Sequence, residues 1–108
     1  MLRVALIASL AFASLAAAAA DAPRYALAIK DHKYVPAELT IPANTKVMLV
    51  VTNQDPTAEE FESNDLNREK VVVGKSSINV PIGPLKPGRY KFFGDFHQDT
   101  AQGVLIAK

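Results

Sequence analysis

The chain has 108 residues and no cysteine, which excludes disulfide-stapled scaffolds, thiolate zinc sites and cysteine nucleophiles. Its 12 basic and 11 acidic residues give a formal net charge of +1, so the composition favours neither nucleic acid nor an anionic membrane as a partner. This length is that of a single domain.

The first 20 residues have the pattern of a secretory signal peptide. Arg3 precedes an apolar stretch over residues 4–15, and a run of alanines ends in an A-x-A site at Ala20. A membrane anchor is the alternative, but it needs about 20 strongly apolar residues, and this alanine-rich tract is weak for spanning. We therefore expect cleavage, a periplasmic location and a mature domain over residues 21–108 that does not insert into the membrane.

Short strands separated by turn signals follow in the mature region. Alternating apolar residues, β-branched runs and intervening proline, glycine and asparagine residues predict about seven or eight strands. They are expected at residues 25–30, 39–41, 46–52, 60–63, 69–73, 78–82, 90–93 and 104–107. The segment 31–36 is expected to be a loop, because Pro36 removes a ladder donor. No stretch after the signal has sustained helical periodicity, so the fold class is all-β, a two-sheet antiparallel sandwich or Greek-key barrel.

The inward-facing positions of these strands predict the core. Apolar faces of short strands must pack against each other, and the residues expected there are Leu27, Ile29, Leu39, Ile41, Leu49, Val51, Phe61, Val80, Tyr90, Phe92 and Leu105.

Side chains that can bind metal ions are concentrated in two segments. AEEFES contains Glu59, Glu60 and Glu62, and GDFHQDTAQG contains Asp95 and His97. Carboxylate oxygen and imidazole nitrogen suit iron, copper(II), zinc or manganese. Because side-chain direction alternates along a strand, Glu60 and Glu62 should share one face and Glu59 should point to the other.

Each candidate also has a purely structural interpretation. His97 could cap a strand through hydrogen bonds, and His32 could be exposed in a polar turn. Glu60 and Glu62 could form a solvated strand face paired to Arg68 and Lys70, an arrangement that contributes little to stability.

Three segments carry a resemblance to a known family. PGRYKFFGDFHQDTAQG, residues 87–103, resembles the copper loop of the cupredoxins, and YVPAELTIPANTKV, residues 34–47, resembles their opening motif. VTN at residues 51–53, followed by a loop and AEEFES, resembles the strand and loop that carry the family's first histidine. In register, the family's cysteine falls on Gly94, its two histidines fall on Glu59 and His97, and its axial methionine falls on Gln102. The resemblance implies a cupredoxin-like Greek-key β-sandwich. A blue type 1 copper centre is impossible here, because that centre needs a thiolate.

The combination of EFES, L-x-REK and FHxxTAQG is most similar to the EfeO-type cupredoxin-like component of bacterial ferrous-iron uptake systems. That resemblance implies a periplasmic protein that binds copper and/or iron and assists ferrous iron oxidation and uptake. Its partners would be a periplasmic iron-binding protein and an inner-membrane iron permease. A copper-dependent ferroxidase is the enzymatic form of this function, and a metal-free β-sandwich module that binds a protein partner is the alternative.

The expected metal ligands follow from the motifs that match. Glu60 and Glu62 from one segment should converge with Asp95 and His97 from the other at one end of the sandwich. The full set is Glu60, Glu62, Glu69, Asp95 and His97, with Glu59, Gln102 and His32 as weaker candidates.

Overall fold

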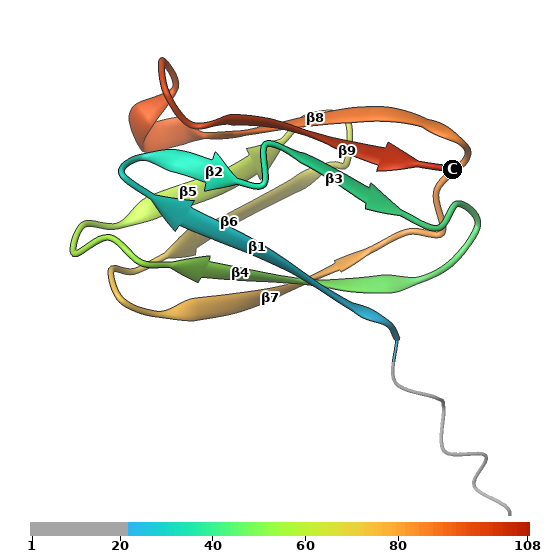
Figure 1. Ribbon diagram of the computed structural model, residues 1–108, viewed down its shortest axis with the longest axis horizontal. Helices are drawn as coiled ribbons and strands as arrows, with labels where there is room; N and C mark the ends of the chain where they lie inside the picture. The colour runs from blue at the N-terminus through green and yellow to red at the C-terminus, as the bar shows by residue number, and fades with distance from the viewer. Residues whose placement is uncertain (1–21) are drawn as a thin grey trace, which may run out of the picture.

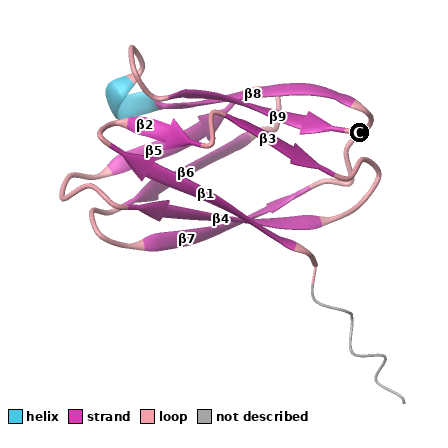
Figure 2. Cartoon of the chain, in the orientation of Figure 1, coloured by secondary structure: helices cyan, strands magenta, loops and turns pink. Residues whose placement is uncertain are grey.

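The computed structural model describes residues 22–108, and the expected signal peptide lies outside them. This part of the chain forms nine strands, arranged in two packed sheets, and one short 3-10 helix (Figures 1 and 2). The predicted all-β class is therefore confirmed. The elements are β1 (Arg24–Lys30), β2 (Lys33–Val35), β3 (Glu38–Ile41), β4 (Val47–Asn53), β5 (Glu59–Ser63), β6 (Arg68–Val72), β7 (Ser77–Ile82), β8 (Gly88–Gly94), η1 (Asp95–His97) and β9 (Gln102–Ala107).

The strands form a four-stranded sheet of order β2-β1-β4-β7 and a five-stranded sheet of order β3-β9-β8-β5-β6. The expectation of a wholly antiparallel sandwich is wrong, since β1 pairs with β4 and β3 pairs with β9 in parallel. Parallel neighbours need a crossover connection. Between β1 and β4 the chain crosses to the other sheet, where it forms β3, and then returns.

A tight turn between β1 and β2 corrects a second expectation. Asp31 and His32 both have left-handed backbone angles, with φ of 52° and 57°. The chain therefore reverses at once, and residues expected to be a loop pair back onto β1, with Val35 opposite Ala28. The carboxylate of Asp55 accepts hydrogen bonds from both turn amides, Asp31 N at 2.8 Å and His32 N at 3.0 Å.

The core lies between the sheets, where alternate residues of each strand point inward. In β4 every second residue from Val47 to Asn53 is buried, and the rings of Tyr34, Phe61 and Phe92 meet edge-on or tilted within it. The predicted core positions are buried except Leu39 and Tyr90, which are partly buried and pack against the core. Within residues 22–108, no helix is long and apolar enough to cross a membrane.

One end of the sandwich gathers the segments that carry the candidate residues. The β1–β2 turn, the loop leading into β5, and η1 all lie at this end (Figure 1, left). The termini of the described chain lie toward the other end.

Candidate metal site

Strand β5 distributes its three glutamates to two faces, as its alternation predicts. Glu59, Phe61 and Ser63 are buried, whereas Glu60 and Glu62 are half-buried on the outer face of the five-stranded sheet. β5 lies between β6 and β8, so these outward side chains have neighbours on both sides.

Three carboxylates converge on that outer face. One oxygen each from Glu60, Glu62 and Asp95 lies within 4.8 Å of the others. Asp95 reaches them because β8 pairs with β5, with Phe93 opposite Glu62, and η1 begins directly after β8. Glu69 on β6 lies opposite Glu62 in the ladder. We call Glu60, Glu62, Glu69 and Asp95 the carboxylate cluster.

The electrostatics of this cluster favour a cation. Partial desolvation, together with the carboxyl groups of Glu62, Glu69 and Asp95, raises the pKa of Glu60 from 4.5 to about 7. Like charges that share a small volume disfavour each other's ionised form. A bound cation would reverse that effect.

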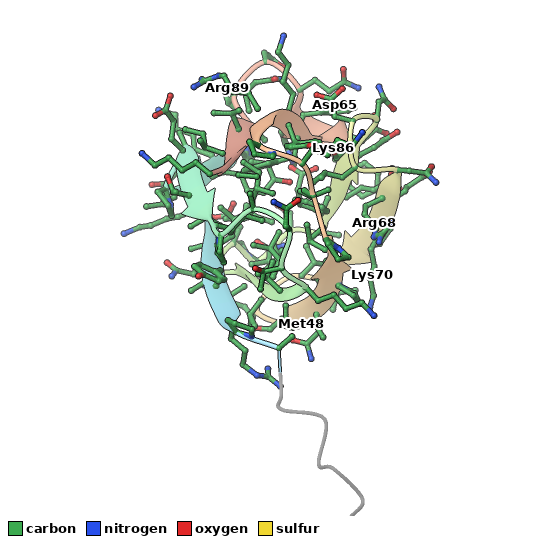
Figure 3. The ribbon with its side chains drawn as sticks, turned by 90° about the vertical axis from the view of Figure 1, so that its right-hand side faces the viewer. Met48, Asp65, Arg68, Lys70, Lys86 and Arg89 are labelled. Atoms are coloured by element: carbon green, nitrogen blue, oxygen red, sulfur yellow. The ribbon has the colours of Figure 1, made fainter. Side chains whose placement is uncertain are left out.

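Basic side chains on the neighbouring strand do not neutralise the cluster. Arg68 donates from Nε to the carbonyl oxygen of Pro81 at 3.0 Å, and Lys70 Nζ donates to that of Asn79 at 3.4 Å. Figure 3 shows both side chains where β6 faces β7. Among residues 22–108, the basic side chains that contact a carboxylate group are Arg89, which contacts Glu38, and His97, which contacts Glu59. The interpretation of a strand face paired to Arg68 and Lys70 is therefore wrong.

His97 belongs to a different group, on the inner side of β5. Its Nδ1 lies 2.5 Å from Oε2 of Glu59, whose side chain is 2% exposed. The other carboxylate oxygen of Glu59 accepts the backbone N–H groups of Glu60 at 2.9 Å and Phe96 at 2.8 Å. The ring of His32 stacks on that of His97, with centroids 3.6 Å apart.

The structure thus divides the predicted site into two groups. It brings Glu60, Glu62 and Asp95 together and places Glu69 beside them, but it pairs His97 with Glu59. The physical reason is that Glu59 points inward from β5 and binds the imidazole from the core side. Gln102, a weaker candidate, donates instead to the carbonyl oxygen of Gln98 at 2.6 Å.

Two residues that shape this end were not among the candidates. Burial alone would raise the pKa of the Asp55 carboxyl, but the backbone amides of His32 and Asp31, with His32 and Lys75 nearby, lower it below its usual value. Tyr34 donates to the carbonyl oxygen of Phe93 at 3.1 Å, and burial together with the Glu59 carboxylate raises its pKa. The N-x-D spacing before Pro56 was a usable signal, since Asn53 Oδ1 accepts the Asp55 amide at 3.0 Å.

The position that would hold the cupredoxin copper does not fit that ion here. A Cβ on Gly94 would lie 2.5 Å from Cδ and 2.8 Å from Oε2 of Glu59, and 2.7 Å from Cβ of Ala101. The Glu59 carboxylate therefore fills the space that a cysteine side chain would need. With no thiolate, and with Nδ1 of His97 bound to Glu59, the donor set of a type 1 centre is missing.

Comparison with known proteins gives a consistent picture of the fold. The family model described as Cupredoxin-like domain matches residues 2–107. An uncharacterized protein of Rickettsia prowazekii (strain Madrid E) is 58% identical over 80 residues, which are 74% of this chain and 64% of that protein. The chain therefore spans less than two thirds of the length of this relative.

Solved structures resemble the chain at low sequence identity. Auracyanin A, a "blue" copper protein from Chloroflexus aurantiacus, is 13% identical with a TM-score of 0.68, covering 79% of this chain and 98% of its own. The metal-binding domain of the Cu(I)-exporting P-type ATPase CopA of Streptococcus pneumoniae D39 is 12% identical with a TM-score of 0.66, covering 79% and 84%. Amicyanin from Paracoccus versutus is 19% identical with a TM-score of 0.62, covering 82% and 83%. These identities establish a shared fold.

Proposed function

The chain belongs to the cupredoxin-like domain family, and from that premise we propose that it is a periplasmic metal-binding protein that binds copper and/or iron through the carboxylate cluster. The observation that carries this proposal is the convergence of Glu60, Glu62 and Asp95 within 4.8 Å without a cationic side chain paired to them in residues 22–108.

The chemistry of the donors supports a hard or borderline cation. Carboxylate oxygens suit iron and copper(II), whereas copper(I) prefers thiolate and thioether ligands. The chain has no cysteine, and Met48 on β4 lies at the opposite end of the sandwich, the end that Figure 3 shows. Clustered carboxylates repel one another when no cation is bound, so a cation that binds only the folded protein should stabilise it.

The EfeO-type resemblance of the EFES, REK and FHxxTAQG motifs supports a place for this metal in ferrous iron uptake. The partners we propose are a periplasmic iron-binding protein and an inner-membrane iron permease. Oxygen consumption during incubation with Fe²⁺, measured with and without copper, tests for the ferroxidase form of this function. Copper-dependent turnover would establish an enzyme, and stoichiometric binding without turnover would establish a binding protein.

The direct test is calorimetric titration of chelator-treated protein with Cu²⁺ and with ferric citrate. The double variant Glu60→Gln, Glu62→Gln should bind at least about tenfold more weakly than wild type, which corresponds to about 1.4 kcal/mol. Glu38→Gln is the matched control, because Glu38 is an exposed carboxylate paired with Arg89 on another strand. Equal affinities for wild type and the double variant would show that the cluster is only a solvated face.

A specific observation also favours the metal-free alternative. Two exposed apolar side chains flank the cluster: Phe96, which follows Asp95, is 50% exposed, and Val71, which lies opposite Glu60, is 46% exposed. Contiguous exposed apolar patches rimmed by polar residues are typical of surfaces that bind another protein. The β-sandwich module becomes the better proposal if neither copper nor iron raises the melting temperature of the purified protein.

A further inference from the structure

Among the largest fully buried side chains of residues 22–108, Glu59 alone has an ionisable group. Both oxygens of its carboxylate have hydrogen-bonding partners. Oε1 accepts two backbone N–H groups, from Glu60 and Phe96, and Oε2 contacts Nδ1 of His97 at 2.5 Å. Charge-assisted hydrogen bonds of this kind are short and strong. This carboxylate therefore connects β5 to η1 from inside the sandwich.

The location of this contact is the place where the cupredoxin resemblance puts a metal ion. Glu59 and His97 stand at the two histidine positions, and Gly94 stands at the cysteine position. The absence of a side chain at Gly94 leaves room for the Glu59 carboxylate, because a Cβ there would lie 2.5 Å from its Cδ. The small residue and the buried carboxylate thus fit each other in size.

We propose that the Glu59 carboxylate takes the place of the family's copper ion: it joins β5 to η1 through hydrogen bonds and closes this position to metal ions. His97 Nδ1 is then a hydrogen-bonding partner of Glu59 and not a metal ligand. This inference goes beyond the proposed function. It rests on the proposed function in one respect only, which is that metal ions bind at the carboxylate cluster.

The neighbouring histidine supports this interpretation. The rings of His32 and His97 are nearly parallel, with an angle of 13° between their planes and 3.6 Å between their centroids. The lone pairs of imidazole nitrogens lie in the ring planes, so two stacked rings cannot direct them at one ion. In addition, Nε2 of His32 lies 3.4 Å from Oγ1 of Thr57. His32 therefore packs on the contact between Glu59 and His97 without completing a metal site there.

The first experiment uses chelator-treated full-length protein with ¹⁵N-labelled histidine and ¹³C-labelled glutamate and aspartate, followed by NMR during titration with diamagnetic Zn²⁺. We expect Nδ1 of His97 to carry a hydrogen-bonded proton before metal is added and to keep it at saturation, while the side-chain carboxyl signals of Glu60, Glu62 and Asp95 shift. No proton on Nδ1 in the metal-free protein, or displacement of that proton by Zn²⁺, would overturn the inference.

The second experiment tests whether removal of the Glu59 carboxylate lets a metal ion bind to His97. Glu59→Ala removes the carboxylate and frees Nδ1 of His97, so Cu²⁺ added to this variant should give an electron paramagnetic resonance spectrum with nitrogen coupling that wild type lacks. The double variant Glu59→Ala, His97→Ala should lose that coupling, and Glu38→Ala should behave as wild type. A folded Glu59→Ala protein whose copper spectrum matches wild type would refute the closing role.

The two arms separate this inference from the proposed function. If wild type binds neither Cu²⁺ nor iron in the calorimetric titration, the proposed function fails, but the metal-free spectrum and the copper spectrum of Glu59→Ala still decide the role of Glu59. If Glu59→Ala does not fold, the wild-type NMR titration decides it. If the cluster binds metal and Nδ1 loses its proton, only the inference fails.

Discussion

His32 and His97 stack with their ring centroids 3.6 Å apart, and each of the two residues is held by a different buried carboxylate. The backbone of His32 is bound by Asp55, and the imidazole of His97 is bound by Glu59. The stack therefore connects the β1–β2 turn of one sheet to the turn that follows β8 in the other. This contact between the sheets fixes the end of the sandwich next to the carboxylate cluster.

The raised pKa of Glu60 predicts a pH-dependent stability. The pKa is about 7 in the folded protein against an ordinary value of 4.5, so the folded state binds more protons than the unfolded state between these values. The contribution of Glu60 to the free energy of unfolding should therefore be most favourable below about pH 4.5 and should decrease as the pH rises toward 7. Melting curves in chelator at pH 5 and pH 8 should show this fall, and Glu60→Gln should flatten it. An unchanged pH slope in Glu60→Gln, with Glu38→Gln as control, would contradict the prediction.

The affinity of the carboxylate cluster for metal should depend on Glu59 only through Asp95. Glu59 binds Phe96 N and His97 Nδ1, the two residues that follow Asp95, so it holds the turn that brings Asp95 to the cluster. In an otherwise wild-type protein, Glu59→Gln should weaken Cu²⁺ binding at the cluster. In a protein that already carries Asp95→Asn, it should have no further effect. Calorimetry on the four proteins of this cycle measures the coupling. Additive losses would show that Glu59 does not act through Asp95.

Adding one methyl group at Gly94 should destabilise the fold. The new Cβ would lie 2.5 Å from a carboxylate fixed by three contacts and 2.7 Å from Ala101 Cβ, and neither neighbour can move freely. Overpacking of this kind costs about 1–3 kcal/mol, which urea denaturation of Gly94→Ala would measure. Gly88→Ala is the control on the same strand, because its Cβ would come no closer than 3.6 Å to other atoms. Equal losses in the two variants would argue against the close contact.

Removing the carboxylate of Asp55 should loosen the β1–β2 turn. Asp55→Ala removes the acceptor of the Asp31 and His32 amides, and a hydrogen bond to a charged group contributes about 1.5–3 kcal/mol. Because the pKa of Asp55 is lowered in the folded state, the stabilisation from this group exists at neutral pH and is lost as the pH falls. Denaturation at pH 7 and pH 3 should therefore show a smaller difference between variant and wild type in acid. Exposed Asp99→Ala serves as the control.

Sequence patterns predicted all the strands except β2, most of the core and the opposite directions of Glu59 and Glu60, because these depend on local alternation. They did not predict which carboxylate His97 would meet. That outcome depends on the space beside Gly94, which exists only once β5 and β8 are paired. The directions of Arg68 and Lys70 were likewise beyond local pattern, since the carbonyl oxygens of Pro81 and Asn79 that they contact belong to a strand of the other sheet.

The placement of Arg68 and Lys70 gives the molecule an electric asymmetry that its net charge of +1 hides. β6 directs its cationic groups toward β7 at the edge of the other sheet and its anionic Glu69 to the outer face, beside three more carboxylates. A nearly neutral chain thereby presents one strongly negative face, which would attract cations over a distance set by the ionic strength, about 8 Å at physiological salt. Capture of a metal ion by this face should therefore slow as salt is added, although the protein as a whole carries almost no charge.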